Sequence, residues 1–494
     1  MNNLALQRIK EMKRYNPPLL GRRDFRGLLL DFNERTLPPS PKVLKAIQNF
    51  LSANKLQIYP EYDGLEQKLA KYAGVNKNQI MITNGSDQAI DLIFRTFTEK
   101  SDTVIIPAPS FAMYDQSAQI IGNKILRLKK INKSVKLIVI CNPNNPTGTL
   151  VSIDAIEEIA KKAPNAIILV DEAYFEFSGV TAIPLIKKCP NIIITRTFSK
   201  AFGLSSLRIG YIVAEKNYIN ELLKVCGPYT VNMFAYTTAL AALDDLQNMQ
   251  NYVTEVITQA KPMVEEFFTK ENITFYPSSA NFLLFKPDQK NIIKSLRDNG
   301  ISVRSREDML RVSIGTVDQM KQFIKVYKDI ASKRYAFLDR DGTLIFEPQD
   351  TFQIDSVDKL KILNGVINSL KKLQNLDYKL IMVTNQDGLG TYFFPKENFE
   401  VAQNKMLNIF KENGISFKQI FICPHLPTEN CNCRKPKTGL IKKFLKENSI
   451  DKDNSFMCGD RESDKLFAAN AGIKYVPMQT NGDFFKALKK GGVL

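Results

Sequence analysis

The chain repeats one pattern: short, wholly apolar segments alternate with segments of helical periodicity. In the first part of the 494 residues, the apolar segments are Ile80–Thr83, Thr103–Ile106, Leu137–Ile140, Ile167–Val170 and Ile192–Thr195. Strands that are apolar on both sides must be covered on both faces, and strands separated by helices usually run parallel. The pattern therefore predicts an α/β fold built on a mostly parallel sheet.

A second series of the same kind begins near residue 335. Its apolar segments are Tyr335–Leu338, Lys379–Asn385, Gln419–Cys423, Ser455–Asp460 and Lys474–Pro477. A chain of 494 residues exceeds one ordinary domain, and the last roughly 160 residues suffice for a small three-layer domain. We therefore predict two domains, residues 1–332 and 334–494.

Charge and hydropathy exclude several classes of function. The net charge is +17, but the lysines are spread over the whole chain, so we expect no nucleic-acid partner. No apolar run approaches the roughly 18 residues of a membrane helix, and the N-terminus lacks the apolar core of a signal peptide. We expect a cytoplasmic protein without a membrane partner, whose basic field attracts phosphorylated small molecules.

Four polar motifs follow the strands of the first series. They are Thr83–Ile90 (TNGSDQAI), Cys141–Gly148 (CNPNNPTG), Val170–Tyr174 (VDEAY) and Thr195–Lys200 (TRTFSK), the last continuing to Leu207–Gly210. A glycine and a serine at a helix start can form an anion site, and open α/β sheets bind ligands where their strands end. Each motif alone could equally be a helix cap, a turn or a solvated surface.

In this order and spacing, the four motifs resemble the fold type I pyridoxal-phosphate aminotransferases over roughly residues 1–330. The resemblance implies a large α/β domain at about 41–250, and a small α+β domain from the N-terminal segment plus about 251–332. It implies that Lys200 holds the cofactor covalently and moves the substrate proton, and that Asp171 pairs with the ring nitrogen. The other implied cofactor contacts are Ser86, Ser199 and Arg208 at the phosphate, Asn145 and Tyr174 at the phenolic oxygen, Phe111 stacked on the ring, and Asp87.

Further landmarks are similar to those of the histidinol-phosphate aminotransferases: Leu30–Glu34, Tyr59-Pro60 and Asn84–Asp87. In that family the tyrosine matching Tyr59 reaches the partner's cofactor phosphate, which implies a homodimer. The resemblance also implies that Arg304 and Arg311 bind the substrate phosphate, that Tyr15 touches substrate, and that glutamate donates the amino group. Phe111 departs from relatives that carry tyrosine there, so a hydroxyl is lost while stacking survives.

The second series opens with the sharpest motif of the chain, Asp339–Thr343 (DRDGT). Residues two apart on an extended strand share a side, so Asp339 and Asp341 can face one site. With Thr384 and Asp460 at the ends of other strands, the motif resembles the haloacid dehalogenase phosphatases. The resemblance implies a nucleophilic Asp339, a proton-transferring Asp341, and phosphoryl contacts from Thr384 and Lys435. It also implies Mg²⁺ held by Asp339, Asp460 and the backbone carbonyl of Asp341, because a carboxylate that attacks a phosphate needs its repulsion screened.

Three cysteines and the only histidine of the chain lie within eleven residues, as Cys423, His425, Cys431 and Cys433. This set suits a closed, structural Zn²⁺ site that orders a loop and brings Lys435 to the active site. Such a zinc loop occurs in two related phosphatases, for histidinol phosphate and for heptose bisphosphate. The segments Thr384–Thr391 and Leu344–Pro348 resemble those of the histidinol-phosphate phosphatases, and the resemblance spans residues 334–480. It implies that Asn385, in the first of these segments, contacts the substrate.

Together the two resemblances imply consecutive steps of histidine biosynthesis. The first domain would convert imidazole-acetol phosphate to histidinol phosphate, and the second would hydrolyse that product. One alternative is an aminotransferase or decarboxylase for another phosphorylated substrate, joined to a heptose-bisphosphate phosphatase. Another is a basic regulatory protein on an enzyme scaffold, which the intact Lys200, Asp171, Asp339 and Asp341 disfavour.

Overall fold

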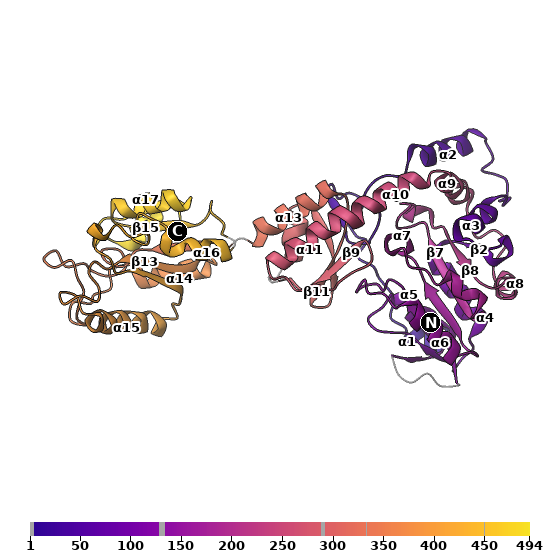
Figure 1. The fold of residues 1–494 in the computed structure, drawn as a ribbon, viewed down its shortest axis with the longest axis horizontal. Helices are drawn as coiled ribbons and strands as arrows, with labels where there is room; N and C mark the ends of the chain where they lie inside the picture. Colours follow the sequence, from indigo (N-terminus) through magenta and orange to yellow (C-terminus); the bar gives the residue numbers. More distant parts are fainter. Residues whose placement is uncertain (1–3, 128–133, 288–291, 332, 449) are drawn as a thin grey trace. The chain divides into compact units, whose positions relative to one another are not determined.

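The computed structural model describes residues 4–127, 134–287, 292–331, 333–448 and 450–494. The chain forms two compact units, Met1–Tyr327 and Lys328–Leu494, which Figure 1 colours along the sequence. Ser332, the predicted last residue of the first domain, lies outside the described residues. In the described part of the chain, no helix has the length and apolar character to cross a membrane.

The first unit is built on a mixed, mostly parallel sheet of seven strands. Their order is β2 (Ile80–Thr83), β8 (Gly210–Val213), β7 (Ile192–Thr197), β6 (Ile167–Asp171), β5 (Val135–Cys141), β3 (Thr103–Ile105) and β4 (Lys124–Leu126). β8 runs antiparallel to both of its neighbours, and the other pairs are parallel. The predicted α/β class is confirmed, whereas β4 and β8 were not predicted.

Both faces of this sheet are buried. Helices α4 (Gly85–Phe97), α5 (Ala112–Ile121) and α8 (Lys216–Val225) pack on the face that presents Leu169. The neighbouring Ile168 points to the other face, because side chains alternate along a strand, and it is buried too. Polar side chains of the central strands can therefore reach a ligand only where the strands end.

A separate sheet of four strands joins the N-terminal segment to the end of the first unit. Its order is β1 (Leu28–Leu30), β10 (Ile301–Arg306), β11 (Met309–Ser313) and β9 (Phe282–Phe285). Strands β10 and β11 form a hairpin with a two-residue turn, in which Glu307 has a φ of 55°. Figure 1 shows α11 (Lys261–Lys270) and α13 (Val317–Ala331) alongside this sheet.

Further helices complete the first unit. They are α1 (Gln7–Glu11), α2 (Pro41–Ser52), α3 (Leu65–Ala73), α6 (Ile153–Lys162), α7 (Phe175–Ser178), α9 (Met233–Leu243), α10 (Leu246–Glu255) and α12 (Ile292–Asp298). A π-helical segment, Val256–Ala260, links α10 to α11.

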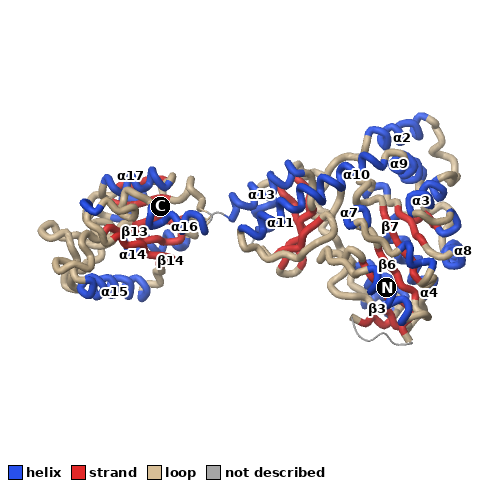
Figure 2. Tube along the Cα trace, viewed as in Figure 1, coloured by secondary structure: helices blue, strands red, loops and turns tan. Residues whose placement is uncertain are grey.

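The second unit is a three-layer structure around a parallel five-stranded sheet, whose strands are red in Figure 2. The strand order is β14 (Phe417–Cys423), β13 (Lys379–Asn385), β12 (Tyr335–Leu338), β15 (Phe456–Gly459) and β16 (Lys474–Pro477). One face, with Leu338, packs on α14 (Val366–Asn375), α15 (Lys396–Glu412) and α18 (Phe484–Lys490). The other face, with Phe337, packs on α16 (Lys442–Glu447) and α17 (Glu462–Ala471).

Strand β12 lies at the point where the strand order of this sheet reverses. β13 follows on one side and β15 on the other, and both are parallel to β12. The residues that come after these three strands therefore meet at one edge, which is where open α/β sheets bind their ligands.

Candidate active sites

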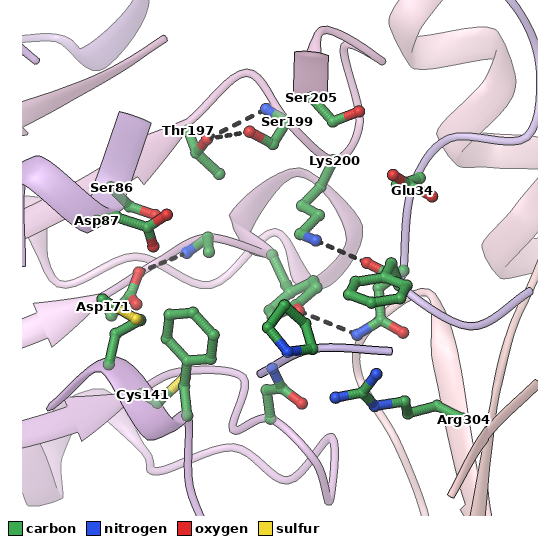
Figure 3. Close-up of a pocket in the computed structure, with 18 of the residues that line it drawn as sticks. Glu34, Ser86, Asp87, Cys141, Asp171, Thr197, Ser199, Lys200, Ser205 and Arg304 are labelled. Carbon is green, nitrogen blue, oxygen red and sulfur yellow. Dashed lines mark hydrogen bonds between the residues drawn. The ribbon is translucent and has the colours of Figure 1, made fainter. Parts of the chain in front are cut away.

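A cavity of about 560 Å³ in the first unit gathers nearly all of the residues predicted for it. Its walls include the predicted residues Tyr15, Ser86, Asp87, Phe111, Asn145, Asp171, Tyr174, Ser199, Lys200, Arg208, Arg304 and Arg311. Most of these residues come from the ends of β5, β6 and β7, from the start of α4 and from the β10–β11 hairpin. Tyr15 comes from the N-terminal segment, Phe111 directly precedes α5, and Arg208 lies just before β8. Figure 3 shows the labelled members around one central space.

Lys200 follows β7 and extends into this space (Figure 3). Its Nζ donates a hydrogen bond to the carbonyl oxygen of Phe32 at 2.9 Å. Burial and, after it, the nearby positive charge of Arg311 lower the pKa of Lys200 to about 8. The amine therefore loses its proton at a lower pH than an ordinary lysine does, and the neutral form can act as a nucleophile.

Asp171, at the end of β6, is a buried carboxylate held by three donors. It accepts hydrogen bonds from Tyr114 Oη at 2.5 Å, Thr195 Oγ1 at 3.0 Å and the backbone N–H of Ala173 at 3.1 Å. Burial raises the pKa of Asp171, and these hydrogen bonds act against that rise. Among the described residues no cation forms an ion pair with it, so a cationic ring nitrogen in the cavity would be its natural partner.

The start of α4 forms an anion site together with Arg208. Arg208 donates to Asp87 Oδ2 at 2.9 Å and to Ser199 Oγ at 3.2 Å. Gly85 has a φ of +73°, and a Cβ there would lie 2.7 Å from Arg208 Nη2, so only glycine permits this approach. The free N–H groups of the helix start, the serine hydroxyls and the guanidinium suit a phosphate group.

Asn145 and Tyr174 lie between these groups and the hairpin. Tyr174 accepts a hydrogen bond from Asn33 Nδ2 at 3.0 Å, and burial raises the pKa of its hydroxyl to about 12. Arg311 donates to the side chain of Asn145 and, at 2.8 Å, to the carbonyl oxygen of Asp31. The tyrosine thus keeps its proton and can donate it to an oxygen in the cavity.

Tyr59 is the one predicted cofactor contact outside the cavity of its own chain. It is 76% exposed, and its ring stacks on that of Tyr229 with centroids 4.7 Å apart. Its predicted contact with a partner subunit stays a prediction.

Taken together, the first site fits pyridoxal phosphate. The Lys200 amine, a buried carboxylate that pairs with no cation of the described residues, and a helix start suited to a phosphate surround one cavity. Tyr114 and Arg306, which also belong to this site, were not predicted. Tyr114 lies on α5 among core residues and gives no distinguishing signal, whereas the Arg304-x-Arg306 spacing was a signal that could have been used.

In the second unit, Asp339 follows β12 directly and pairs with Lys435, whose Nζ lies 2.6 Å from Asp339 Oδ1. Lys435 also lies 2.6 Å from Asp464 Oδ1 at α17. Both carboxylates and the lysine are almost fully buried. Burial raises the pKa of Asp339, and the Lys435 ammonium group opposes that rise.

Asp339, Asp460 and Asp464 bring carboxylate oxygens within 4.8 Å of one another. Three acids with one buried lysine leave an excess of negative charge, which fits a divalent cation with oxygen ligands. Asp464 was not predicted, although an acid four residues after Asp460 was visible in the sequence. The carboxylate of Asp341 lies outside this group, and its predicted metal contact through the backbone carbonyl stays a prediction.

The side chain of Asp341 is held from two sides. Arg340 Nη1 donates to one oxygen at 2.5 Å, and Gln386 Nε2 donates to the other at 2.6 Å. Gln386 also donates to Thr384 Oγ1 at 2.8 Å, which ties the end of β13 to the Asp341 carboxylate.

The side chain of Asn385 hydrogen-bonds the backbone of Lys435. Its Oδ1 accepts from the Lys435 N–H at 3.0 Å, and its Nδ2 donates to the Lys435 carbonyl at 3.3 Å. These bonds help to position Lys435, and the predicted contact of Asn385 with substrate stays a prediction.

The four predicted zinc ligands converge at the end of β14. The three sulfur atoms of Cys423, Cys431 and Cys433 lie 3.2 to 3.7 Å apart, and His425 Nδ1 lies 3.1 Å from Cys433 Sγ. A tetrahedral site with Zn–S bonds of about 2.3 Å has sulfur atoms about 3.8 Å apart, so the donor set and its spacing fit Zn²⁺. Beside it, Arg434 forms an ion pair with Asp387 of the loop after β13.

Comparisons with known proteins divide the chain in the same way. Residues 27–326 match the family described as aminotransferase class I and II, and residues 334–484 match polynucleotide kinase 3 phosphatase. The histidinol-phosphate aminotransferase of Ruminiclostridium cellulolyticum is 35% identical over 319 residues, 59% of this chain and 88% of the relative.

Two further relatives cover the two parts. The histidine biosynthesis bifunctional protein HisB of Campylobacter jejuni is 54% identical over 143 residues, 29% of this chain and 41% of that protein. The solved structure of histidinol-phosphate aminotransferase from Sinorhizobium meliloti, in complex with pyridoxal-5'-phosphate, is 22% identical with a TM-score of 0.60. It covers 67% of this chain and 99% of that chain, and at this identity the likeness concerns the fold alone.

Proposed function

The chain belongs to the aminotransferase class I and II family, and from this premise we propose a bifunctional enzyme of histidine biosynthesis. The first unit transfers an amino group from glutamate to imidazole-acetol phosphate, and the second hydrolyses the resulting histidinol phosphate to histidinol and phosphate. The observation that carries the proposal is that one chain contains two sites, each lined by reactive residues. One has a buried lysine facing arginines, and the other has paired aspartates next to a buried lysine.

In the first site, Lys200 is the residue that would hold pyridoxal phosphate covalently through its Nζ, and it would move the proton at the substrate's α carbon. Asp171 would accept a hydrogen bond from the ring nitrogen. When bound, the cofactor carries the amino group between the two substrates and withdraws electrons from that carbon.

The remaining residues of the first site bind and orient. Ser86, Ser199 and Arg208 would hold the cofactor phosphate. Asn145 and Tyr174 donate hydrogen bonds to the phenolic oxygen. Arg304 and Arg311 bind the anionic end of the substrate through bidentate contacts.

In the second site, Asp339 Oδ attacks the phosphorus, so that a new O–P bond forms while the ester O–P bond breaks. A protonated Asp341 gives its proton to the leaving alkoxide, then takes one from the water that cleaves the O–P bond to Asp339. Lys435 and Thr384 hold the phosphoryl oxygens. Asp339, Asp460, Asp464 and the Asp341 carbonyl would hold Mg²⁺, whose charge offsets the repulsion between carboxylate and phosphate.

The zinc site serves structure. Four protein ligands leave no open position for substrate, and the loop they close carries Arg434 and Lys435. With zinc bound, this loop would keep Lys435 where its Nζ meets Asp339 Oδ1.

We also propose that the enzyme is a homodimer. Leu56 and Ile58, close to Tyr59 in sequence, are 62% and 58% exposed, and Tyr229, which stacks on Tyr59, is 56% exposed. An exposed apolar group of this kind suits a protein interface. In the dimer, Tyr59 would reach the cofactor phosphate of the partner subunit.

A comparison of kcat/KM between candidate substrates tests the proposal. The purified enzyme with Mg²⁺ should hydrolyse histidinol phosphate with a kcat/KM at least about tenfold above that for heptose bisphosphate, a ratio worth about 1.4 kcal/mol. The first unit should likewise prefer imidazole-acetol phosphate to other phosphorylated ketones. A preference for heptose bisphosphate would support the alternative pair of activities and contradict this one.

A further inference from the structure

Three arginines share one face of the β10–β11 hairpin. Arg304 and Arg311 are direct cross-strand partners. Arg306 lies two residues after Arg304 on β10, so its side chain leaves the strand on the same face. All three line the cavity of the first unit. Neither the resemblance to known families nor the proposed function assigns a role to Arg306.

No acid of the described chain neutralises these three cations by a salt bridge. The acids that line the cavity have other partners, since Glu34 pairs with Arg22 at 2.5 Å and Asp87 pairs with Arg208 at 2.9 Å. Asp171 accepts hydrogen bonds from Tyr114 and Thr195. Arg304 Nη1, Arg306 Nε and Arg311 Nε are buried and make no hydrogen bond with the described residues.

Burying three like charges together costs free energy unless an anion joins them. The positive charge of Arg306 contributes, after burial, to lowering the pKa of both Arg304 and Arg311. The three groups are therefore close enough to repel one another. A bound anion would turn this repulsion into attraction and would supply acceptors for the unpaired N–H groups.

The charge and shape of an anion decide how strongly the third arginine attracts it. A phosphate monoester carries a charge of about −1.5 to −2 near pH 7 and offers three free oxygens. A carboxylate carries a charge of −1 and offers two. The Coulomb attraction of one further cation scales with the ligand's charge, so the third arginine favours the phosphate. Arg304 and Arg311 alone could already serve the two oxygens of a carboxylate.

We propose that Arg306 is the specificity-determining residue that makes this end of the pocket select dianionic phosphate esters over carboxylates. The inference rests on the proposed function, because it assumes that glutamate and a phosphorylated substrate use the same pocket in turn. It goes beyond that function by naming the side chain that separates the two ligand classes.

The test compares Arg306→Met with Arg306→Lys, both made with Asp339→Asn so that the second unit does not consume the phosphate ester. Arg306→Met should lower kcat/KM for histidinol phosphate by about 10- to 100-fold, which is the range for a hydrogen bond to a charged group. The kcat/KM for glutamate should fall by less than about threefold, as for a weakly coupled charge. Arg306→Lys should recover part of the loss, because it keeps the charge.

Lys286→Met is the matched control. Lys286 directly follows β9 in the same sheet, its side chain is 63% exposed, and it does not line the cavity. This variant removes one positive charge from the sheet without touching the pocket, so both kcat/KM values should stay at the wild-type level. Circular dichroism and the visible absorbance of bound cofactor confirm that each variant folds.

A second measurement separates this inference from the proposed function. The assay follows the reaction of the cofactor-loaded enzyme with glutamate by visible absorbance. Inorganic phosphate and glutarate are tested separately as inhibitors of this reaction. Arg306→Met should raise the inhibition constant of phosphate by about tenfold or more and that of glutarate much less. This result would uphold the role of Arg306 even if histidinol phosphate proved not to be a substrate. Equal losses for the two anions, or no loss for phosphate, would overturn it.

Discussion

At the scale of single residues, the pKa of Lys200 decides when its amine can react. Burial lowers this pKa to about 8, whereas an ordinary lysine titrates near about 10.4. The neutral amine is the nucleophile, so the rate at which the cofactor-free protein captures pyridoxal phosphate should rise with pH and level off above about 8. Stopped-flow absorbance over pH 6 to 10 measures this profile, and a midpoint near that of an ordinary lysine would contradict it.

Residues that act directly after a strand could be predicted from the sequence, and residues that depend on a distant partner could not. Asp171, Lys200 and Asp339 follow apolar strands, and the edge of a sheet gathers such residues. Tyr114 meets Asp171 from a helix 57 positions away, and nothing in its local sequence separates it from a core residue. For Arg306 the Arg304-x-Arg306 spacing indicates a shared strand face, whereas its place in the site depends on the β10–β11 hairpin, whose register the local sequence does not give.

At the scale of elements, β6 and β7 are locked by a buried ion pair behind the cofactor site. Arg196 Nε and Nη2 donate to Glu172 Oε2 at 3.0 and 2.8 Å, and both side chains are buried. Arg196→Met would leave the Glu172 charge buried without a cation, so we expect a loss of about 3–5 kcal/mol in the free energy of unfolding of the first unit.

The double variant Arg196→Met with Glu172→Gln should recover much of that loss, because the buried charge is gone. Urea denaturation of the two variants measures the difference. Equal stability of the single and the double variant would show that the charge itself does not matter.

The zinc loop is a second element whose removal has a defined result. It ends in Arg434, which pairs with Asp387, and Lys435, whose backbone binds Asn385. Cys431→Ser, or removal of zinc by a chelator, should lower phosphatase kcat/KM about tenfold or more and leave amino transfer unchanged. Metal analysis and phosphate release measure the outcome. Full phosphatase activity in a zinc-free protein would rule out this role.

Most of the predicted strands are apolar runs long enough to fill both faces of a sheet, although the buried strands β8 and β9 were missed. Val135–Cys141 and Phe417–Cys423 extend the predicted segments by only a few residues. β4, with two exposed residues, and the three-residue β1 lack such a run. β1 is a strand because it pairs with β10, about 270 residues later, a contact that local periodicity does not encode.

At the scale of the whole molecule, the proposed dimer predicts that two inactive chains can repair each other. Lys200→Ala removes the amine of one chain, and Tyr59→Ala removes the contact donated to its partner. A mixed dimer would contain one site with both defects and one site with neither. Co-expression with two different affinity tags isolates it, and its amino transfer per dimer should approach half of the wild-type value. Activity no higher than that of the single variants would contradict a shared site.

The central claim is that one chain performs two consecutive reactions, and product stoichiometry tests it most directly. Given imidazole-acetol phosphate, glutamate and Mg²⁺, the enzyme should release 2-oxoglutarate, histidinol and phosphate in equal amounts. Asp339→Asn should stop at histidinol phosphate, with phosphate release lowered by about 10³-fold or more, as expected for loss of a nucleophile. Lys200→Ala should form no 2-oxoglutarate but still hydrolyse added histidinol phosphate. Phosphate release at the wild-type rate by Asp339→Asn, or 2-oxoglutarate formation by Lys200→Ala, would contradict the account.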